Sequence, residues 1–123
     1  MADFKDLLGK TITKIEGMEV GSDKIIFTLN TGDQYKLYHE QGCCESVAIE
    51  DVCGVVDDLI GSPITMADES SSGENPDGVT KGYQDSFTWT FYKLATFKGF
   101  VDVRWYGESN GYYSESVDFA KIN

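Results

Sequence analysis

SFTWTFY (86–92) and VDVRWY (101–106) are the two segments that decide the fold. In both, aromatic or β-branched side chains occupy every second position, which is the period of a β-strand that buries one face. The short segments KGF (98–100) and GESNG (107–111) favour tight connections between neighbouring antiparallel strands. This part of the chain therefore predicts a β-meander.

The aromatic residues of the meander divide between core and surface, because successive side chains point to opposite faces of a strand. We expect Trp89, Phe91 and Trp105 to pack in the core. Tyr106 and Tyr112 flank the GESNG turn and remain as candidate surface anchors, since aromatic residues are enriched at protein interfaces.

Residues nearer the N-terminus also favour strands, over 11–20, 24–30 and 34–40, with NTGD (30–33) as a hairpin turn. A further short strand is predicted over 46–52, and GVVDDLIG (54–61) predicts a helix of about two turns before Pro63. The expected fold is α+β. It is a single domain over residues 1–123, in which a twisted antiparallel sheet of about six strands packs against one or two short helices.

Residues 67–80 (ADESSSGENPDGVT) have no apolar periodicity and are rich in Ser, Gly, Asp and Glu. This composition predicts a mobile acidic loop within the domain rather than a linker between domains.

The chain is strongly acidic, with 21 Asp and Glu against 10 Lys and Arg, a net charge of −11 and a pI near 4.3. Such a charge repels nucleic acid and anionic membranes and favours a basic partner. It also keeps a protein soluble and monomeric without any partner, and a monomer is what we expect here. No signal peptide and no membrane-spanning stretch is recognisable, and the odd count of three Cys fits a reducing compartment, so a cytoplasmic location is predicted.

The acidity is concentrated between Leu37 and Thr80, where 44 residues contain no Lys or Arg. A contiguous negative region of this kind favours electrostatic docking to a basic protein surface. With the two tyrosines named above, the candidate partner-binding residues are Glu45, Glu50, Asp51, Asp57, Asp58, Asp68, Glu69, Tyr106 and Tyr112.

The same region holds the residues that zinc prefers, because tetrahedral zinc sites are built from His nitrogen and Cys sulfur. The candidate ligands are His39, Cys43, Cys44 and Cys53. No second His or placed base is available to activate a bound water, so the hypothesis is a structural zinc rather than a catalytic one.

Three alternatives to this ligand set remain open. In the first, one member of the Cys43–Cys44 doublet is a core residue and Glu40, Glu45 or Asp51 completes the shell. In the second, the cysteines are small buried hydrophobes and His39 caps a polar edge of the core. In the third, the cysteines form a redox switch.

An enzymatic function is not predicted. The chain contains one His and no nucleophile elbow, phosphate-binding loop or dinucleotide fingerprint. Glu115 is the one carboxylate of interest, because it shares strand parity with Tyr113, Val117 and Phe119.

Four segments carry a resemblance to a known group of proteins: LYHEQGCCESVAIEDVCG (37–54), DLIGSPI (58–64), SFTWTFYKLAT (86–96) and VRWYGESNGYYSESV (103–117). Together they resemble a family of small acidic proteins of phages and prophages, described mainly as a domain of unknown function. Within that setting the chain is similar to zinc-containing type II-A anti-CRISPR proteins that inhibit Cas9.

The resemblance implies a protein that binds Cas9 in the bacterial cytoplasm and blocks DNA loading or cleavage stoichiometrically. It also implies that His39, Cys43, Cys44 and Cys53 hold the metal. The alternative is a small structural zinc-binding phage protein with an unrelated protein partner.

Overall fold

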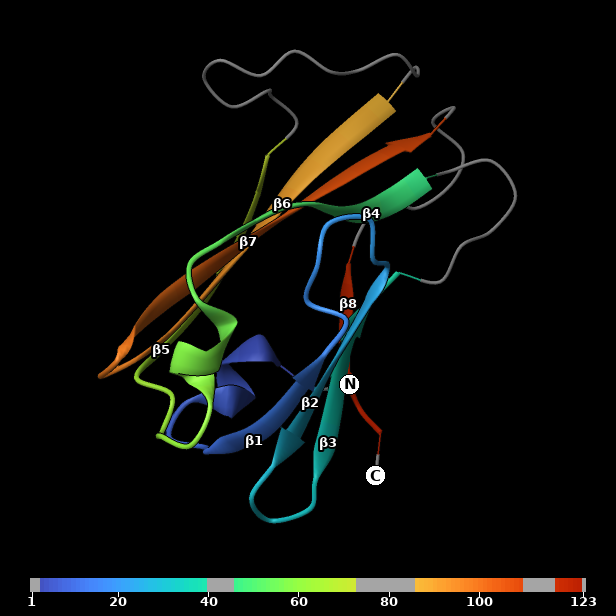
Figure 1. Cartoon of the computed structure of the whole chain (residues 1–123). Helices are drawn as coiled ribbons and strands as arrows, with labels where there is room; N and C mark the ends of the chain where they lie inside the picture. The colour runs from blue at the N-terminus through green and yellow to red at the C-terminus, as the bar shows by residue number, and fades with distance from the viewer. Residues whose placement is uncertain (1–2, 40–45, 73–85, 110–116, 123) are drawn as a thin grey trace.

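The computed structural model describes residues 3–39, 46–72, 86–109 and 117–122, and Figure 1 shows the course of the chain. Within these ranges the chain forms eight strands and two short 3₁₀ helices. In chain order they are η1 (Phe4–Leu7), β1 (Ile12–Glu16), β2 (Lys24–Leu29), β3 (Gln34–Tyr38), β4 (Ser46–Cys53), η2 (Val56–Leu59), β5 (Met66–Ser72), β6 (Ser86–Thr96), β7 (Gly99–Ser109) and β8 (Asp118–Lys121).

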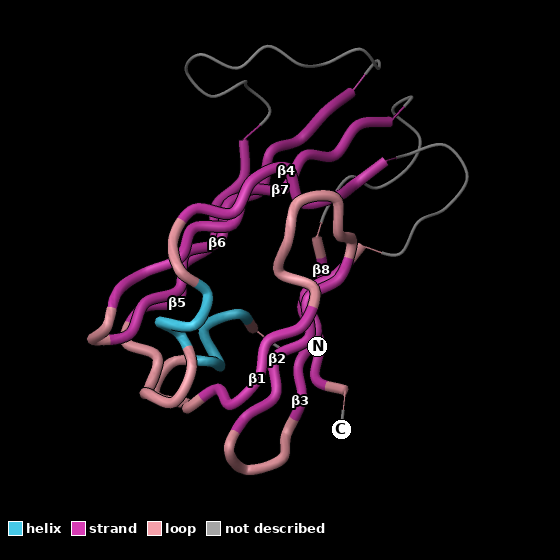
Figure 2. The backbone as a smooth tube through the Cα atoms, in the orientation of Figure 1, coloured by secondary structure: helices cyan, strands magenta, loops and turns pink. Residues whose placement is uncertain are grey.

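The strands form two four-stranded antiparallel sheets. Sheet I has the order β1-β2-β3-β8 and sheet II the order β4-β7-β6-β5. Figure 2 shows the two sheets side by side with the 3₁₀ helices between them at one end. The fold is therefore mostly β, a two-layer arrangement in which each sheet buries one face.

The core lies between the sheets and is formed by alternate residues of both. Ile25, Phe27 and Leu37 from sheet I and Leu94 and Trp105 from sheet II are almost completely buried. The N-terminal helix η1 links the two layers, because Phe4 lies 4.8 Å from the Tyr92 ring of β6 and 5.5 Å from the Phe119 ring of β8. Alternate burial along these strands fixes which side chains remain outside.

The fold class predicted from the sequence was only partly right. Antiparallel strands in one small domain are confirmed, but there are two sheets instead of one six-stranded sheet, and the helices are single 3₁₀ turns. The division arises because β8 pairs with β3 and not with β7, so the C-terminal strand closes sheet I. The predicted helix over 54–61 shrinks to Val56–Leu59, since Gly61 has φ +83° and the chain then makes bridges with Ile12 and Thr11.

The segment predicted as a mobile acidic loop falls partly within β5. Residues 67–72 pair with β6 along the edge of sheet II, and residues 73–80 lie outside the described residues. The polar side chains of residues 68–71 are exposed, while the backbone of β5 pairs with that of β6.

Within the described ranges, none of the helices has the length and apolar character needed to cross a membrane.

Candidate docking face

The outward face of sheet II is an ordered array of side chains, because the β5–β6 and β6–β7 registers are continuous and the β4–β7 register shifts once, between Ile49 and Asp51. The cross-strand rows, each written from β5 to β4 where those strands contribute, are Met66, Ala95, Phe100; Asp68, Lys93, Asp102, Cys53; Ser70, Phe91, Arg104, Asp51; Trp89, Tyr106, Ala48; and Phe87, Glu108, Ser46. The residues between them, such as Leu94, Val103 and Trp105, point to the core.

The second and third rows line a groove of about 500 Å³. Four acidic residues line it, namely Asp51, Asp68, Glu69 and Asp102, with Phe91 in the middle and Cys53 at one end. Lys93 is the cross-strand neighbour of both Asp68 and Asp102, and its Nζ is 3.7 Å from Asp102 Oδ1. One lysine therefore faces two carboxylates, which leaves negative charge for a ligand.

Arg104 is the second cation of this face, and it is already engaged. Its Nε donates to Glu50 Oε2 at 2.6 Å, and its guanidinium carbon lies 5.2 Å from the Trp89 ring. Glu50 reaches Arg104 because the β4–β7 register shifts between Ile49 and Asp51, so that two successive carboxylates of β4 lie beside one arginine.

A second hollow of about 400 Å³ lies beyond the Arg104–Glu50 pair. It is lined by the end of the β1–β2 loop, the first half of β4, Tyr106 and Glu108. The Tyr106 hydroxyl donates to Glu108 Oε2 at 3.0 Å, which orients the ring over the sheet. Tyr106 also lies 4.7 Å from the Trp89 ring and 6.1 Å from Phe87. Trp89, although it faces outward, is 0% exposed.

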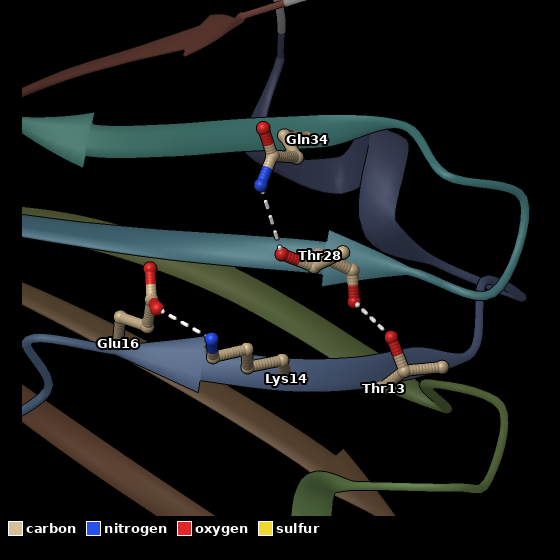
Figure 3. A network of polar contacts seen from close by, with 5 residues as sticks. All are labelled: Thr13, Lys14, Glu16, Thr28 and Gln34. Carbon is tan, nitrogen blue, oxygen red and sulfur yellow. Dashed lines mark hydrogen bonds and ion pairs between the residues drawn. The ribbon is translucent and has the colours of Figure 1, made fainter.

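The charges of this face are unbalanced. Among its described residues, the two cations Lys93 and Arg104 are outnumbered by the carboxylates of Glu50, Asp51, Asp68, Asp102 and Glu108. The outward positions of sheet I carry instead three lysines (Lys14, Lys24 and Lys36) and two carboxylates (Glu16 and Asp118). Figure 3 shows part of that face, where Thr28 accepts a hydrogen bond from Gln34 and from Thr13, beside the Lys14–Glu16 pair.

Glu69 borders the groove from the edge strand and interacts with Tyr92 below it. Burial raises the pKa of Tyr92 above its usual range, and the nearby carboxylate of Glu69, which also forms a hydrogen bond with the ring hydroxyl, raises the pKa further. Asp118 of sheet I adds a smaller effect in the same direction. Tyr92 therefore stays neutral and keeps its hydrogen-bond donor at all physiological pH values.

The structure brings together several of the residues predicted to bind a partner. Asp51, Asp68 and Glu69 line the groove, while Glu50 and Tyr106 lie in the neighbouring hollow. Asp57 and Asp58 are on η2, which packs against β6 and β7 at the end of the same sheet. Glu45 and Tyr112 lie outside the described residues, as does Glu115.

The two described members of the predicted zinc set do not face a common point. His39 follows the inward-facing Leu37 and is 7% exposed, while Cys53 is an exposed free thiol in the groove on the outward face of sheet II. The described residues contain no group of three metal-binding side chains. Cys43 and Cys44 lie outside them, so the zinc site remains a prediction. Elemental analysis of protein expressed with ample zinc tests it, and a content far below one zinc per chain would exclude it.

The sequence prediction missed Lys93, Asp102 and Arg104 as parts of the site. Asp102 and Arg104 alternate with core residues in VDVRWY (101–106), so the strand period predicts their outward direction. Lys93 follows SFTWTFY (86–92) and has the parity that the sequence analysis placed in the core, so its outward direction was not predicted. The meeting of these three residues with Asp51 and Asp68 was not readable, because it depends on β4 and β5 flanking the β6–β7 hairpin.

Comparison with known proteins gives the family but no activity. A family model described only as a domain of unknown function, DUF7448, matches residues 5–119, nearly the whole chain, and the protein belongs to that family. No curated protein matches the chain, and no solved structure does.

Proposed function

We propose that this member of the DUF7448 family is a non-enzymatic binding protein that presents the outward face of sheet II to a basic protein surface. The observation that carries the proposal is the excess of carboxylates in the described part of that face, five against two cations, over a groove and a neighbouring hollow. A surface of this kind favours association with lysine- and arginine-rich partners through steering and complementary contacts.

The partner proposed from the family resemblance is the RNA-guided nuclease Cas9. Nuclease grooves that hold nucleic acid are lined with basic side chains, so an acidic sheet can occupy such a groove in place of the phosphates. Inhibition by this route takes place in the bacterial cytoplasm. It is stoichiometric, because each inhibitor molecule occupies one nuclease molecule. It requires no reaction at the acidic face.

Direct binding and DNA cleavage by Cas9 loaded with guide RNA test this function. We expect the protein to bind and to reduce cleavage once it is in molar excess over the nuclease. Absence of both effects rejects the proposal for the Cas9 tested.

The role of the acidic face is tested by charge neutralisation with a matched control. Asp51→Asn with Asp68→Asn removes two charges from the groove, and Glu16→Gln with Asp33→Asn removes two from residues of sheet I and its β2–β3 turn. We expect the first pair to weaken binding roughly tenfold at low ionic strength and the second to leave it nearly unchanged. Because exposed charges are screened, the difference shrinks as salt is added.

A further inference from the structure

The turn between β6 and β7 exposes two aromatic side chains at one end of the outward face of sheet II. Phe97 is 81% exposed and Phe100 is 54% exposed, the first in the turn itself and the second at the start of β7. An exposed phenylalanine lacks the favourable free energy of burial, which is about 1.5–3 kcal/mol for a large apolar side chain. Two of them at the tip of a hairpin mark an interaction surface.

The turn that carries Phe97 is held in place on both sides. The Thr96 hydroxyl donates to the Asp58 carbonyl of η2, and Lys98 Nζ donates to the Ile60 carbonyl at 2.7 Å. The Lys98 N–H also bonds to Thr96 Oγ1 at 3.2 Å. Phe97 is therefore presented from a backbone that is already ordered, and its burial against a partner costs little backbone entropy.

Two further exposed apolar residues belong to segments that neighbour the β6–β7 hairpin at this end of the sheet. Met66, which is exposed, shares a cross-strand row with Phe100 through Ala95. Exposed Val55 follows Gly54, whose φ is +116° and whose missing Cβ leaves room for the Phe100 carbonyl. We call the residues Val55, Met66, Phe97 and Phe100 the tip patch.

The tip patch has carboxylates around it. Asp102 and Asp68 occupy the next row of the sheet, and the Asp58 carboxylate lies against Gly99 in the turn. The two lysines nearby are engaged, since Lys93 lies over the Phe100 ring at 5.1 Å and close to Asp102, and Lys98 is bonded to Ile60. The rim therefore has three carboxylates against two ammonium groups, a small excess of negative charge around an apolar centre.

We infer that the tip patch is the apolar anchor of the docking face, with Phe97 entering an apolar pocket of the partner protein that is ringed by lysine or arginine. This inference rests on the proposed function. It adds an apolar part of the interface, whose contribution to the binding affinity does not depend on salt concentration. Charge complementarity selects the partner, because the rim carboxylates favour cations around the pocket. The buried aromatic side chain then supplies the anchoring contact.

The experiment compares Phe97→Ser with Ile122→Ser in binding to Cas9 loaded with guide RNA, at low and at high ionic strength. Both changes remove an exposed large apolar side chain, but Ile122 follows β8 in sheet I. We expect Phe97→Ser to raise Kd at least tenfold, by the same factor at both ionic strengths, and Ile122→Ser to leave Kd unchanged. Thermal unfolding of both variants checks that the fold is retained.

The possible failures are distinguishable. If the wild-type protein binds and Phe97→Ser binds equally well, the anchor is rejected and the acidic face stands. If the loss caused by Phe97→Ser shrinks with salt as the loss from Asp51→Asn with Asp68→Asn does, the tip acts through the charges around it and the apolar anchor is again rejected. If the wild-type protein does not bind, the proposed partner and the anchor are both rejected.

Discussion

The two outward faces of the molecule belong to sheets with the same number of strands, yet they differ in charge, in surface shape and in packing. Sheet I exposes threonines, a glutamine and three lysines, with Lys36 lying 4.3 Å from the Tyr38 ring. Sheet II carries the groove, an excess of carboxylates among its described residues and the completely buried Trp89. The groove and the excess of negative charge therefore lie on the same outward face, and the contrast with sheet I is open to measurement.

The largest expected effect concerns Trp89. Truncation by Trp89→Ala removes a fully buried ring that contacts Tyr106 and Arg104, and large-to-small changes of this kind cost about 3–5 kcal/mol. Tyr38→Ala, the control on the outward face of sheet I, removes a partly exposed ring and costs much less. Denaturant unfolding measures both. Equal losses would show that the two outward faces are packed alike.

Trp89 also shows how far the sequence alone could predict this site. Alternation correctly predicted strands over 86–92 and 101–106 and placed Trp105 in the core. Trp89 is completely buried, as predicted, but Trp89 and the partly exposed Phe91 have the outward parity of β6, whereas Tyr92 faces the core between the sheets. The reason is that β6 continues to Thr96. Leu94, in the second half of the strand, is buried between the sheets, so the residues that alternate with it in phase, such as Tyr92, face the core.

The sequence predicted which types of residue form the candidate site, but it did not predict all of the residues that belong to it. The absence of Lys and Arg between residues 37 and 80 indicated an acidic surface, and Asp51 and Asp68 do line one groove. The two described cations of the groove, Lys93 and Arg104, come from β6 and β7. Only the strand order places them between the carboxylates of β4 and β5. Pairings between distant strands depend on the whole fold, and no local pattern in the sequence encodes them.

The second prediction concerns pH and the edge of sheet II. The pKa of Tyr92 is raised by burial and by Glu69, so in the folded state the hydroxyl keeps its proton where the unfolded chain loses it, above a pH of about 10. The folded state then binds more protons than the unfolded state, and stability falls as pH rises, by about 1.4 kcal/mol per pH unit from this group.

Tyr92→Phe separates this contribution from the rest. The variant loses the hydrogen bond to Glu69 and is less stable near neutral pH, but its stability declines less steeply above pH 10 than that of the wild type. Urea unfolding across that pH range gives both slopes. Parallel slopes would contradict the assignment of Tyr92 as the group that titrates only in the unfolded chain.

The smallest effect that still separates the two faces is the coupling within their ion pairs. Arg104 and Glu50 are 25% and 22% exposed, and Arg104 also contacts Trp89, so we expect their double-mutant cycle to give about 1 kcal/mol. Lys14 and Glu16 are 65% and 48% exposed, and although Glu16 raises the pKa of Lys14, water and salt screen that attraction. Their coupling should be near the limit of detection and vanish at high salt. Denaturant unfolding of the Ala variants measures both cycles, and equal couplings would remove the contrast. If Arg104 is held as tightly as its geometry indicates, it is a fixed part of the docking face, and the carboxylates of Asp51 and Asp68 then remain for the partner's cations.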